Sequence, residues 1–193
     1  MINISKKNRV EDHSSKILIS FLFSILIALS SKISVPFYPV PMTMQTMLVL
    51  LSGIILGAKY GCLTLFFYII EGIIGLPVFS GTPEKGIGLT YMLGPTGGYI
   101  LGFAFTAFLS GLLFSNRKIY KKNSKSRYLL VKNLFVIFIK FTLALIPTYL
   151  IGLLWLGIVL GWDKPILEYG FYPFILGEFF KISLVTLFFY KLY

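Results

Sequence analysis

Long apolar runs, separated by short polar segments, dominate this sequence. The hydrocarbon core of a bilayer is about 30 Å thick, so a helix that crosses it needs roughly 20 apolar residues. Six such helices would use most of the 193 residues and leave only short connections. The sequence therefore predicts an all-α membrane protein with six transmembrane helices. The expected helices cover residues 17–33, 42–57, 61–75, 91–114, 129–157 and 171–189.

The composition excludes most soluble classes of protein. Hydrophobic residues make up 56% of the chain and charged residues 13%, which is about half the charged share of a soluble domain. The single cysteine, Cys62, cannot form an internal disulfide, and the single histidine, His13, leaves no His/Cys metal cluster or histidine-based triad. The sequence also lacks a phosphate-binding Gly-x-x-x-x-Gly-Lys loop. We therefore expect neither an enzyme nor a metal or cofactor site.

Proline and polar residues mark the ends of the expected helices. Three prolines between residues 36 and 41 end the first run, because proline cannot sustain helical hydrogen bonds. Lys59 and Tyr60 are the only polar material between the second and third runs, which predicts a tight helical hairpin. The other expected features are an ordered loop over 76–90, a kink at Pro147 and a polar loop over 161–169.

The distribution of lysine and arginine predicts the orientation of the bundle. Membrane proteins keep an excess of these residues in cytoplasmic segments. If the N-terminus is cytoplasmic, the inner segments hold 12 of the 18 basic residues, the outer loops hold 3 and the apolar runs hold 3. The expected arrangement has both termini in the cytoplasm. It combines a cytoplasmic basic leader over 1–16 with a single membrane domain over 17–190, which includes a cytoplasmic basic loop over 115–128.

The net charge of +11 has other interpretations that the sequence disfavours. Nucleic-acid binding needs basic residues on a solvated face, whereas here they lie between apolar runs, so the expected partner is the lipid bilayer of the plasma (inner) membrane. The N-terminal region also resembles a signal peptide. It lacks a clean small-residue cleavage site, and its removal would leave five spans.

An acid and a base lie inside the last apolar run. Glu178 and Lys181 are three residues apart, so they share one helical face. Counted from an outer boundary near Phe171, Glu178 lies roughly 10 Å deep at 1.5 Å per residue. A carboxylate and an ammonium at this depth can bind a ligand that has both N–H donors and oxygen acceptors. The alternative is a purely structural ion pair.

Two further ionisable residues lie in apolar runs. Lys140 can extend its side chain to the cytoplasmic headgroups, which is the interpretation we favour for it. Glu71 lies one turn below the outer end of the third run. It is equally compatible with a functional role and with a structural carboxylate that loop amides cap.

Aromatic and hydroxyl side chains gather on the expected outer face. Thr43 and Gln45 open the second run, and Tyr91 opens the fourth. Such residues are common in a headgroup belt. Because they converge with the acid–base pair on one face, they make an outward-facing pocket for a small molecule plausible.

Three ordered motifs carry a resemblance to a known family. They are Val40-Pro41-Met42-Thr43-Met44-Gln45-Thr46, Gly75-Leu76-Pro77-Val78-Phe79 and Leu93-Gly94-Pro95-Thr96-Gly97-Gly98-Tyr99. These blocks and their spacing resemble BioY, the biotin-binding S component of energy-coupling factor (ECF) vitamin transporters. The similarity extends over about residues 18–187.

The resemblance implies a fold, a ligand and partners. It implies the six-helix S-component fold and high-affinity biotin binding near the outer face. It also implies delivery of biotin inward with a transmembrane T component and two cytoplasmic ATPase subunits. A family motif Gly-Asp-x-x-Lys matches Gly177-Glu178-Phe179-Phe180-Lys181, with glutamate in place of aspartate. Glu178 is then expected to accept ureido N–H bonds and Lys181 to hold a ligand oxygen. The expected pocket lining is Thr43, Gln45, Tyr91 and Tyr149.

A stripe of small residues lies on the first expected helix. Ser20, Ser24 and Ala28 are spaced by four, as in the surface where S components dock on the T component. Small residues let helices approach closely in lipid. Packing within this chain explains the same stripe equally well.

Two alternative functions remain open from the sequence. The chain could be an S component for another vitamin. It could instead be a six-span membrane assembly protein that binds no ligand, although the buried acid–base pair argues against this.

Overall fold

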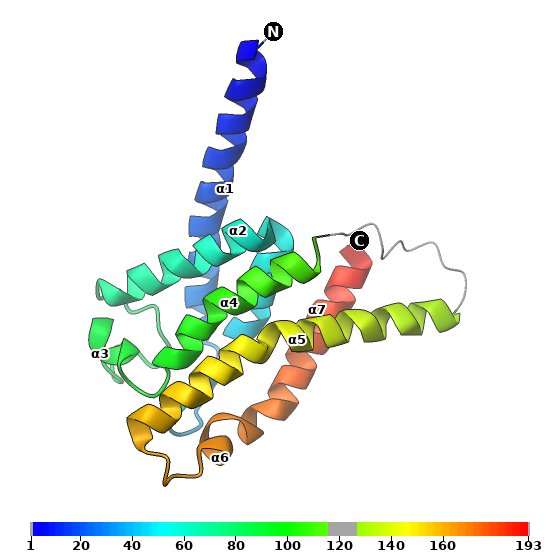
Figure 1. Ribbon diagram of the computed structural model, residues 1–193. Helices are drawn as coiled ribbons and strands as arrows, with labels where there is room; N and C mark the ends of the chain where they lie inside the picture. Colours follow the sequence, from blue (N-terminus) through cyan, green and yellow to red (C-terminus); the bar gives the residue numbers. More distant parts are fainter. Residues whose placement is uncertain (1, 116–126, 193) are drawn as a thin grey trace.

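The computed structural model describes residues 2–115 and 127–192, with side chains over 13–115 and 129–192. Most of the predicted basic loop over 115–128, and the side chains of most of the leader over 1–16, lie outside the described residues. The described chain is a helical bundle in which α4 lies between α2 and α5 (Figure 1). Its long helices are α1 (Ile2–Ser31), α2 (Gln45–Ile73), α4 (Gly97–Leu113), α5 (Arg127–Leu160) and α7 (Ile175–Leu192).

The predicted fold class is confirmed in its coarse form, a helical protein whose helices are apolar enough for a membrane. Within the residues that the structure describes, four helical segments are long and apolar enough to cross a membrane, and α4 is a shorter apolar helix of 17 residues. The segments are His13–Ser31, Gln45–Ile73, Leu129–Leu160 and Ile166–Leu192. Large apolar side chains on their outer faces are exposed, as expected for surfaces in contact with lipid.

The second and third predicted runs form one element, α2, that turns sharply at Gly57. Gly57 has φ 82° and ψ 169°, a conformation that glycine adopts without the steric cost of a side chain. Beyond it the chain doubles back, because a Cβ atom placed on Gly61 would lie 2.8 Å from the Cα of Gly53. The predicted hairpin is therefore present. Its turn lies at Gly57 and not at Lys59 and Tyr60.

The fourth helix starts later than predicted. Tyr91 belongs to a separate short helix, α3 (Gly88–Met92), and α4 begins only at Gly97. The interruption follows from Pro95, which lacks an N–H and disfavours helical backbone in the residue before it. Tyr91 therefore lies on a loop-borne element beside the membrane helices.

Glycines on α4 allow close packing on both sides. A Cβ atom at Gly111 would lie 2.2 Å from the backbone nitrogen of Ala58 in α2. One at Gly102 would lie 2.6 Å from the Cα of Thr148 in α5. Small residues at such contacts let backbones approach in a membrane, where lipid removes the hydrophobic drive for helices to associate.

The last third of the chain follows the prediction with shifted boundaries. Helix α5 contains Pro147. The predicted polar loop over 161–169 includes most of a short helix, α6 (Ile166–Gly170). A 3-10 turn, η2 (Tyr172–Phe174), precedes α7, so the last helix begins four residues later than predicted.

The first outer loop contains two short strands that the sequence did not predict. β1 (Ser34–Val35) pairs antiparallel with β2 (Met42–Thr43), so that Ser34 lies opposite Thr43. We call residues 34–43 the strap. It carries the proline-rich segment across one end of the bundle and places Thr43 just before the start of α2.

Candidate functional site

A cavity lies under the strap, between α2, α3, α4, α5 and α7. Its volume is about 50 Å³. All six residues predicted to bind the substrate line this cavity. They are Thr43, Gln45, Tyr91, Tyr149, Glu178 and Lys181. Polar lining residues that were not predicted are Thr46, Ser80, Thr96 and Thr148.

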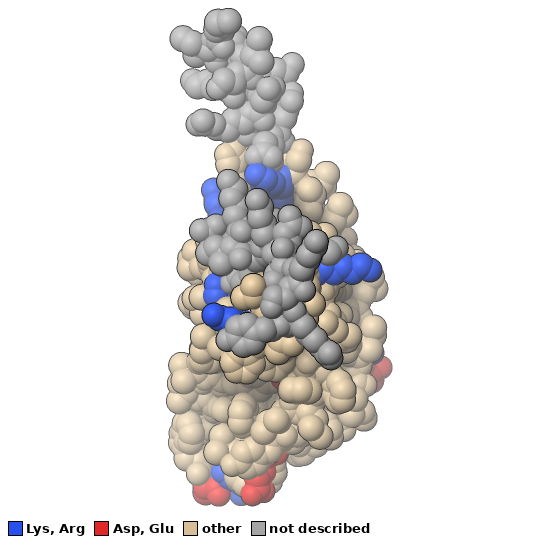
Figure 2. Space-filling model, turned by 90° about the vertical axis from the view of Figure 1, so that its right-hand side faces the viewer, with Lys and Arg blue, Asp and Glu red and all other residues tan. Residues whose placement is uncertain are grey.

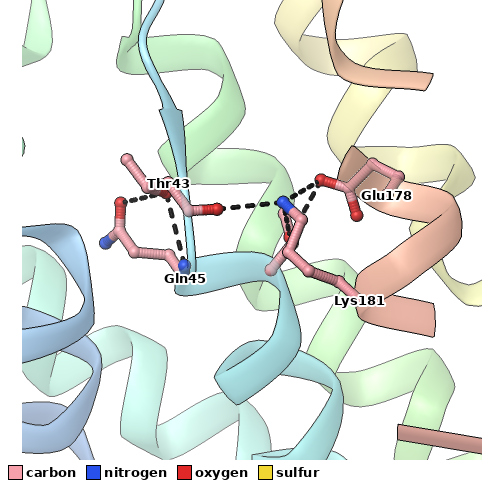
Figure 3. A network of polar contacts seen from close by, with 5 residues as sticks. Thr43, Gln45, Glu178 and Lys181 are labelled. Carbon is pink, nitrogen blue, oxygen red and sulfur yellow. Dashed lines mark hydrogen bonds and ion pairs between the residues drawn. The ribbon is translucent and has the colours of Figure 1, made fainter. Parts of the chain in front are cut away.

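Glu178 and Lys181 form a buried ion pair at the wall of the cavity. The Nζ atom of Lys181 lies 2.5 Å from Oε1 of Glu178, and both residues are at least nine-tenths buried. The spacing of three residues on α7 places both side chains on one face, as predicted (Figure 3). Charges are buried only when paired and hydrogen-bonded, since an isolated one is strongly unfavourable away from water.

Thr46 completes this pair and was missed in the sequence. Its Oγ1 lies 2.9 Å from Oε1 of Glu178 and 2.7 Å from Nζ of Lys181. The ammonium can only donate, so the Thr46 hydroxyl accepts from Lys181 and donates to Glu178. In the sequence Thr46 is only a hydroxyl residue at the start of an apolar run, within the first of the three motifs. Nothing there links it to Glu178 and Lys181, which lie 132 and 135 residues further along the chain.

Lys181 also holds the strap. Its Nζ donates to the carbonyl oxygen of Thr43 at 2.9 Å, which is its third hydrogen bond to the protein (Figure 3). The strap packs directly on α7, because a Cβ atom on Gly177 would lie 2.1 Å from Sδ of Met42. One ammonium therefore joins the carboxylate, the start of α2 and the strap.

Glu178 retains one oxygen without a donor. Its Oε2 has less than 1 Å² exposed and accepts no hydrogen bond within the described part of the chain. An unsatisfied buried acceptor of this kind is unfavourable by about 1–3 kcal/mol. The Tyr149 hydroxyl interacts with the same carboxylate. Glu178 thus brings to the cavity lining a charged acceptor that a ligand N–H can satisfy once the side chains covering Oε2 move apart.

Gln45 and Tyr91 connect the cavity to the third loop, residues 74–87. Gln45 donates from Nε2 to the hydroxyl of Tyr68 at 2.7 Å, and Tyr68 donates to the carbonyl of Val78 at 3.3 Å. Tyr91 donates to the carbonyl of Ser80 at 2.7 Å. Burial raises the pKa of the Tyr91 hydroxyl, which keeps it protonated as a donor. These bonds fix the loop over the cavity.

The end of α1 ties down the same loop. Lys32 donates from Nζ to the carbonyl of Phe79 at 2.9 Å and to Oγ1 of Thr82 at 3.0 Å. Phe79 is fully buried and stacks on Tyr91 with ring centroids 4.9 Å apart. The loop is thus held by polar bonds from one side and by an aromatic side chain from the other.

Aromatic rings form another wall, which packs against the strap through Phe37 and Phe174. The ring centroid of Tyr149 lies 6.1 Å from that of Tyr99, 5.4 Å from that of Phe171 and 6.4 Å from that of Phe174. Ligand pockets combine such apolar walls with a few placed polar groups. The cavity has this character, with one charged acceptor facing an aromatic cluster.

The small-residue stripe on α1 faces the interior of this chain. Ser20 and Ser24 have no exposed surface, and Ala28 packs against the core. Ser20 lies 3.2 Å from the carbonyl of Tyr60, and Ser24 lies 2.6 Å from Oε1 of Glu71. The stripe packs α1 on α2, which agrees with the alternative of packing within this chain, and its role in docking on a T component stays a prediction.

The other ionisable residues of the apolar runs have structural partners. The carboxylate of Glu71 pairs with the Ser24 hydroxyl and not with loop amides. Lys140 donates to the carbonyl of Leu113 at 3.1 Å and lies over the ring of Phe114, so it binds the end of α4. Its extension to the cytoplasmic headgroups stays a prediction. Among the residues whose side chains are described, no three His, Cys, Asp or Glu residues come together as a metal site would require.

Known proteins share this sequence and fold. The model of the BioY family matches residues 5–193. The probable biotin transporter BioY of Pyrococcus horikoshii is 36% identical over 162 residues, which cover 84% of this chain and 86% of that protein. The biotin transporter BioY of Thermotoga maritima is 36% identical over 168 residues, 86% of this chain and 88% of that protein.

A solved structure agrees with these relatives. The crystal structure of the S-component for biotin from an ECF-type ABC transporter superposes with a TM-score of 0.73 at 28% identity. The match covers 94% of this chain and 92% of that one. It confirms the resemblance that the three motifs predicted. Matched over nearly its whole length in sequence and in fold, this chain belongs to the BioY family.

Proposed function

We propose that this chain is the biotin-binding S component of an ECF-type uptake transporter, and that it captures biotin in the cavity under the strap. The names of its relatives and of its structural match support this ligand. The observation that carries the proposal is the buried Oε2 of Glu178, an anionic acceptor without a donor in the cavity wall. The ureido group of biotin supplies an N–H donor that satisfies it.

The six lining residues have distinct roles in this proposal. Glu178 accepts the ureido N–H, while the aromatic wall around Tyr149 packs against the apolar part of the bicyclic ring. Gln45, Tyr91 and Thr43 hold the two loops that cover the ligand. Lys181 neutralises Glu178, and it reaches a ligand oxygen only if it releases one of its three present acceptors.

The proposed topology has six crossings with both termini in the cytoplasm. The sharp turn at Gly57 supports it, since the two halves of α2 then cross separately. The distribution of charge supports the orientation. Lysines gather toward the end from which α1 projects, the opposite end carries acidic and basic groups together, and the surface between is mostly uncharged (Figure 2). Residues 17–190 are the membrane domain in this proposal, and 1–16 and 115–128 are cytoplasmic.

Transport by this chain requires partners in the proposed system. The sequence has no phosphate-binding loop for ATP. In this proposal a T component and two cytoplasmic ATPase subunits provide the energy in the plasma membrane. The match to the S-component of an ECF-type ABC transporter supports it. The stripe of Ser20, Ser24 and Ala28 stays our proposed contact with the T component; Ala28 is half-buried, and Ser20 and Ser24 are buried against α2.

Ligand-dependent stabilisation of the purified chain tests the proposal. Biotin, thiamine, riboflavin and lipoate are each added to the detergent-purified protein, and its thermal unfolding is followed. A ligand at 100 times its Kd stabilises the folded state by about 2.7 kcal/mol. We expect a large shift with biotin alone. A shift with another vitamin instead assigns a different S component, and no shift with any of them favours an assembly protein without a ligand.

A further inference from the structure

The hydrogen bonds around Glu178 restrict what its carboxylate can bind. Oε1 accepts from both Thr46 and Lys181, at 2.9 and 2.5 Å. Thr46 in turn accepts from Lys181 at 2.7 Å, so the three groups form a closed ring of hydrogen bonds. A carboxylate held in this way cannot rotate to exchange its oxygens without breaking two charge-assisted bonds. Only Oε2 remains available to a ligand.

The ammonium of Lys181 has no N–H left to offer. Its three donors go to Thr43, Thr46 and Glu178. The pair of charges is neutral as a unit, and it is buried. A neutral pair in a site of low polarity favours a neutral donor, because a cationic ligand would bring an uncompensated charge into the cavity.

The covering of Oε2 adds a condition on binding. Less than 1 Å² of this oxygen is exposed, so a donor reaches it only when the side chains around it move apart slightly. Oε2, which is buried without a donor, then gains a charge-assisted hydrogen bond from the ligand. A donor that fails to complete this bond leaves the acceptor unsatisfied, so the site discriminates strongly against it.

From this geometry we propose that Thr46 is a positioning residue: by holding Oε1 of Glu178, it leaves Oε2 to accept a hydrogen bond from one neutral N–H group of the ligand. The inference rests on the proposed function and narrows the ligand class to ureas, lactams and similar neutral N–H compounds. A forked cation such as a guanidinium does not fit, because it would need both carboxylate oxygens.

Two biotin analogues, each methylated at a different ureido nitrogen, test the single acceptor without any variant. We expect one analogue to bind roughly 10- to 100-fold more weakly than biotin, as for the loss of one hydrogen bond to a charged group. The other analogue keeps the N–H that faces Glu178 and binds close to biotin. Equal losses for both analogues would overturn the inference.

The cyclic guanidine 2-iminobiotin tests the preference for a neutral donor. At neutral pH its guanidine group is protonated, so the ring that replaces the urea is cationic, and we expect it to bind at least about tenfold more weakly than biotin. Binding as tight as that of biotin would contradict the neutral character of the site. If the wild-type chain binds none of these compounds, biotin included, the proposed function itself fails.

Variants at Thr46 test its positioning role. Thr46→Val removes the hydroxyl at nearly constant volume, and we expect weaker biotin binding and a smaller difference between the two methylated analogues. Thr46→Ser keeps the hydroxyl, so we expect it to restore both the affinity for biotin and the difference between the two methylated analogues. Thr64→Val is the matched control, because Thr64 is also buried on α2 but bonds only to the carbonyl of Tyr60. An unchanged difference between the analogues in Thr46→Val would overturn the role of Thr46, whatever its effect on stability.

Discussion

Lys181 and Thr43 are 138 residues apart, and the Nζ atom of one lies 2.9 Å from the carbonyl oxygen of the other. This bond joins the last helix to the strap that covers the cavity. The same ammonium neutralises Glu178, so one side chain links the charge of the site to its closure. Its removal should therefore affect both stability and ligand binding, and the two effects can be separated.

Lys181→Met should destabilise the chain and abolish tight biotin binding. The substitution leaves the Glu178 carboxylate buried without its counter-charge, a loss of about 3–5 kcal/mol in comparable buried pairs. The double variant Lys181→Met with Glu178→Gln removes both charges, and we expect it to regain most of the thermal stability but not the binding. Equal stability of the single and double variants in thermal unfolding would show that the pair is not coupled as the structure indicates.

Gly177→Ala should weaken biotin binding by displacing the Met42 side chain of the strap. A Cβ atom at this position would lie 2.1 Å from Sδ of Met42, so this side chain must leave its place against α7. We expect an affinity loss of roughly tenfold, which corresponds to about 1.4 kcal/mol.

The double variant Gly177→Ala with Met42→Ala gives the strap room again and should recover part of the affinity. Ser183→Ala, at an exposed position on α7, is the control. If Gly177→Ala binds biotin as tightly as the wild type, close packing of the strap on α7 is not needed for the site.

Lys32→Ala should speed the release of biotin. Lys32 holds the third loop through Phe79 and Thr82, and without it the loop keeps only part of its polar contacts. Loss of these hydrogen bonds from a charged group should accelerate dissociation by roughly tenfold or more. The matched control is Lys164→Ala, since Lys164 pairs with the exposed Asp163 in another outer loop. Identical dissociation rates in a chase experiment would exclude a role for this tether.

Gly111→Ala should destabilise the bundle without a specific effect on the site. Its added Cβ atom meets the backbone of Ala58 at 2.2 Å, and backbone cannot move aside as a flexible side chain can. Overpacking of this kind destabilises by about 1–3 kcal/mol. The measurement is thermal unfolding with and without biotin, and Leu112→Ala on the exposed neighbouring position is the control. A melting temperature unchanged from that of the wild type would show that α2 and α4 are not in close contact there.

The sequence predicted the parts of the site that local spacing reveals. Glu178 and Lys181 stand out because charged residues three apart in an apolar run must share a buried face. Thr46 was not predicted, because its partners lie 132 and 135 residues away and only the fold brings them together. The strands β1 and β2 of the strap were not predicted either, because a strand of two residues is too short to show an alternating pattern.

Helix boundaries were predicted less well than helix positions. Hydropathy does not show that Gly57 takes a positive φ, so the turn of α2 was placed two residues late. The stripe of Ser20 and Ser24 shows a further limit. Regularly spaced small residues predict a close contact between helices, but they do not show which helix makes that contact. Here the contact is with α2 of the same chain.

Equilibrium binding of labelled biotin to the purified chain and to Glu178→Gln tests the central claim most directly. The substitution keeps the shape of the side chain but replaces the charged carboxylate that accepts the ureido N–H with a neutral amide. Glu84→Gln, in the exposed part of the third loop, is the control. We predict saturable binding of one biotin by the wild type and by the control, and a loss of roughly 10-fold or more in Glu178→Gln. Equal biotin affinity in all three proteins would contradict the assignment of this cavity as the vitamin site.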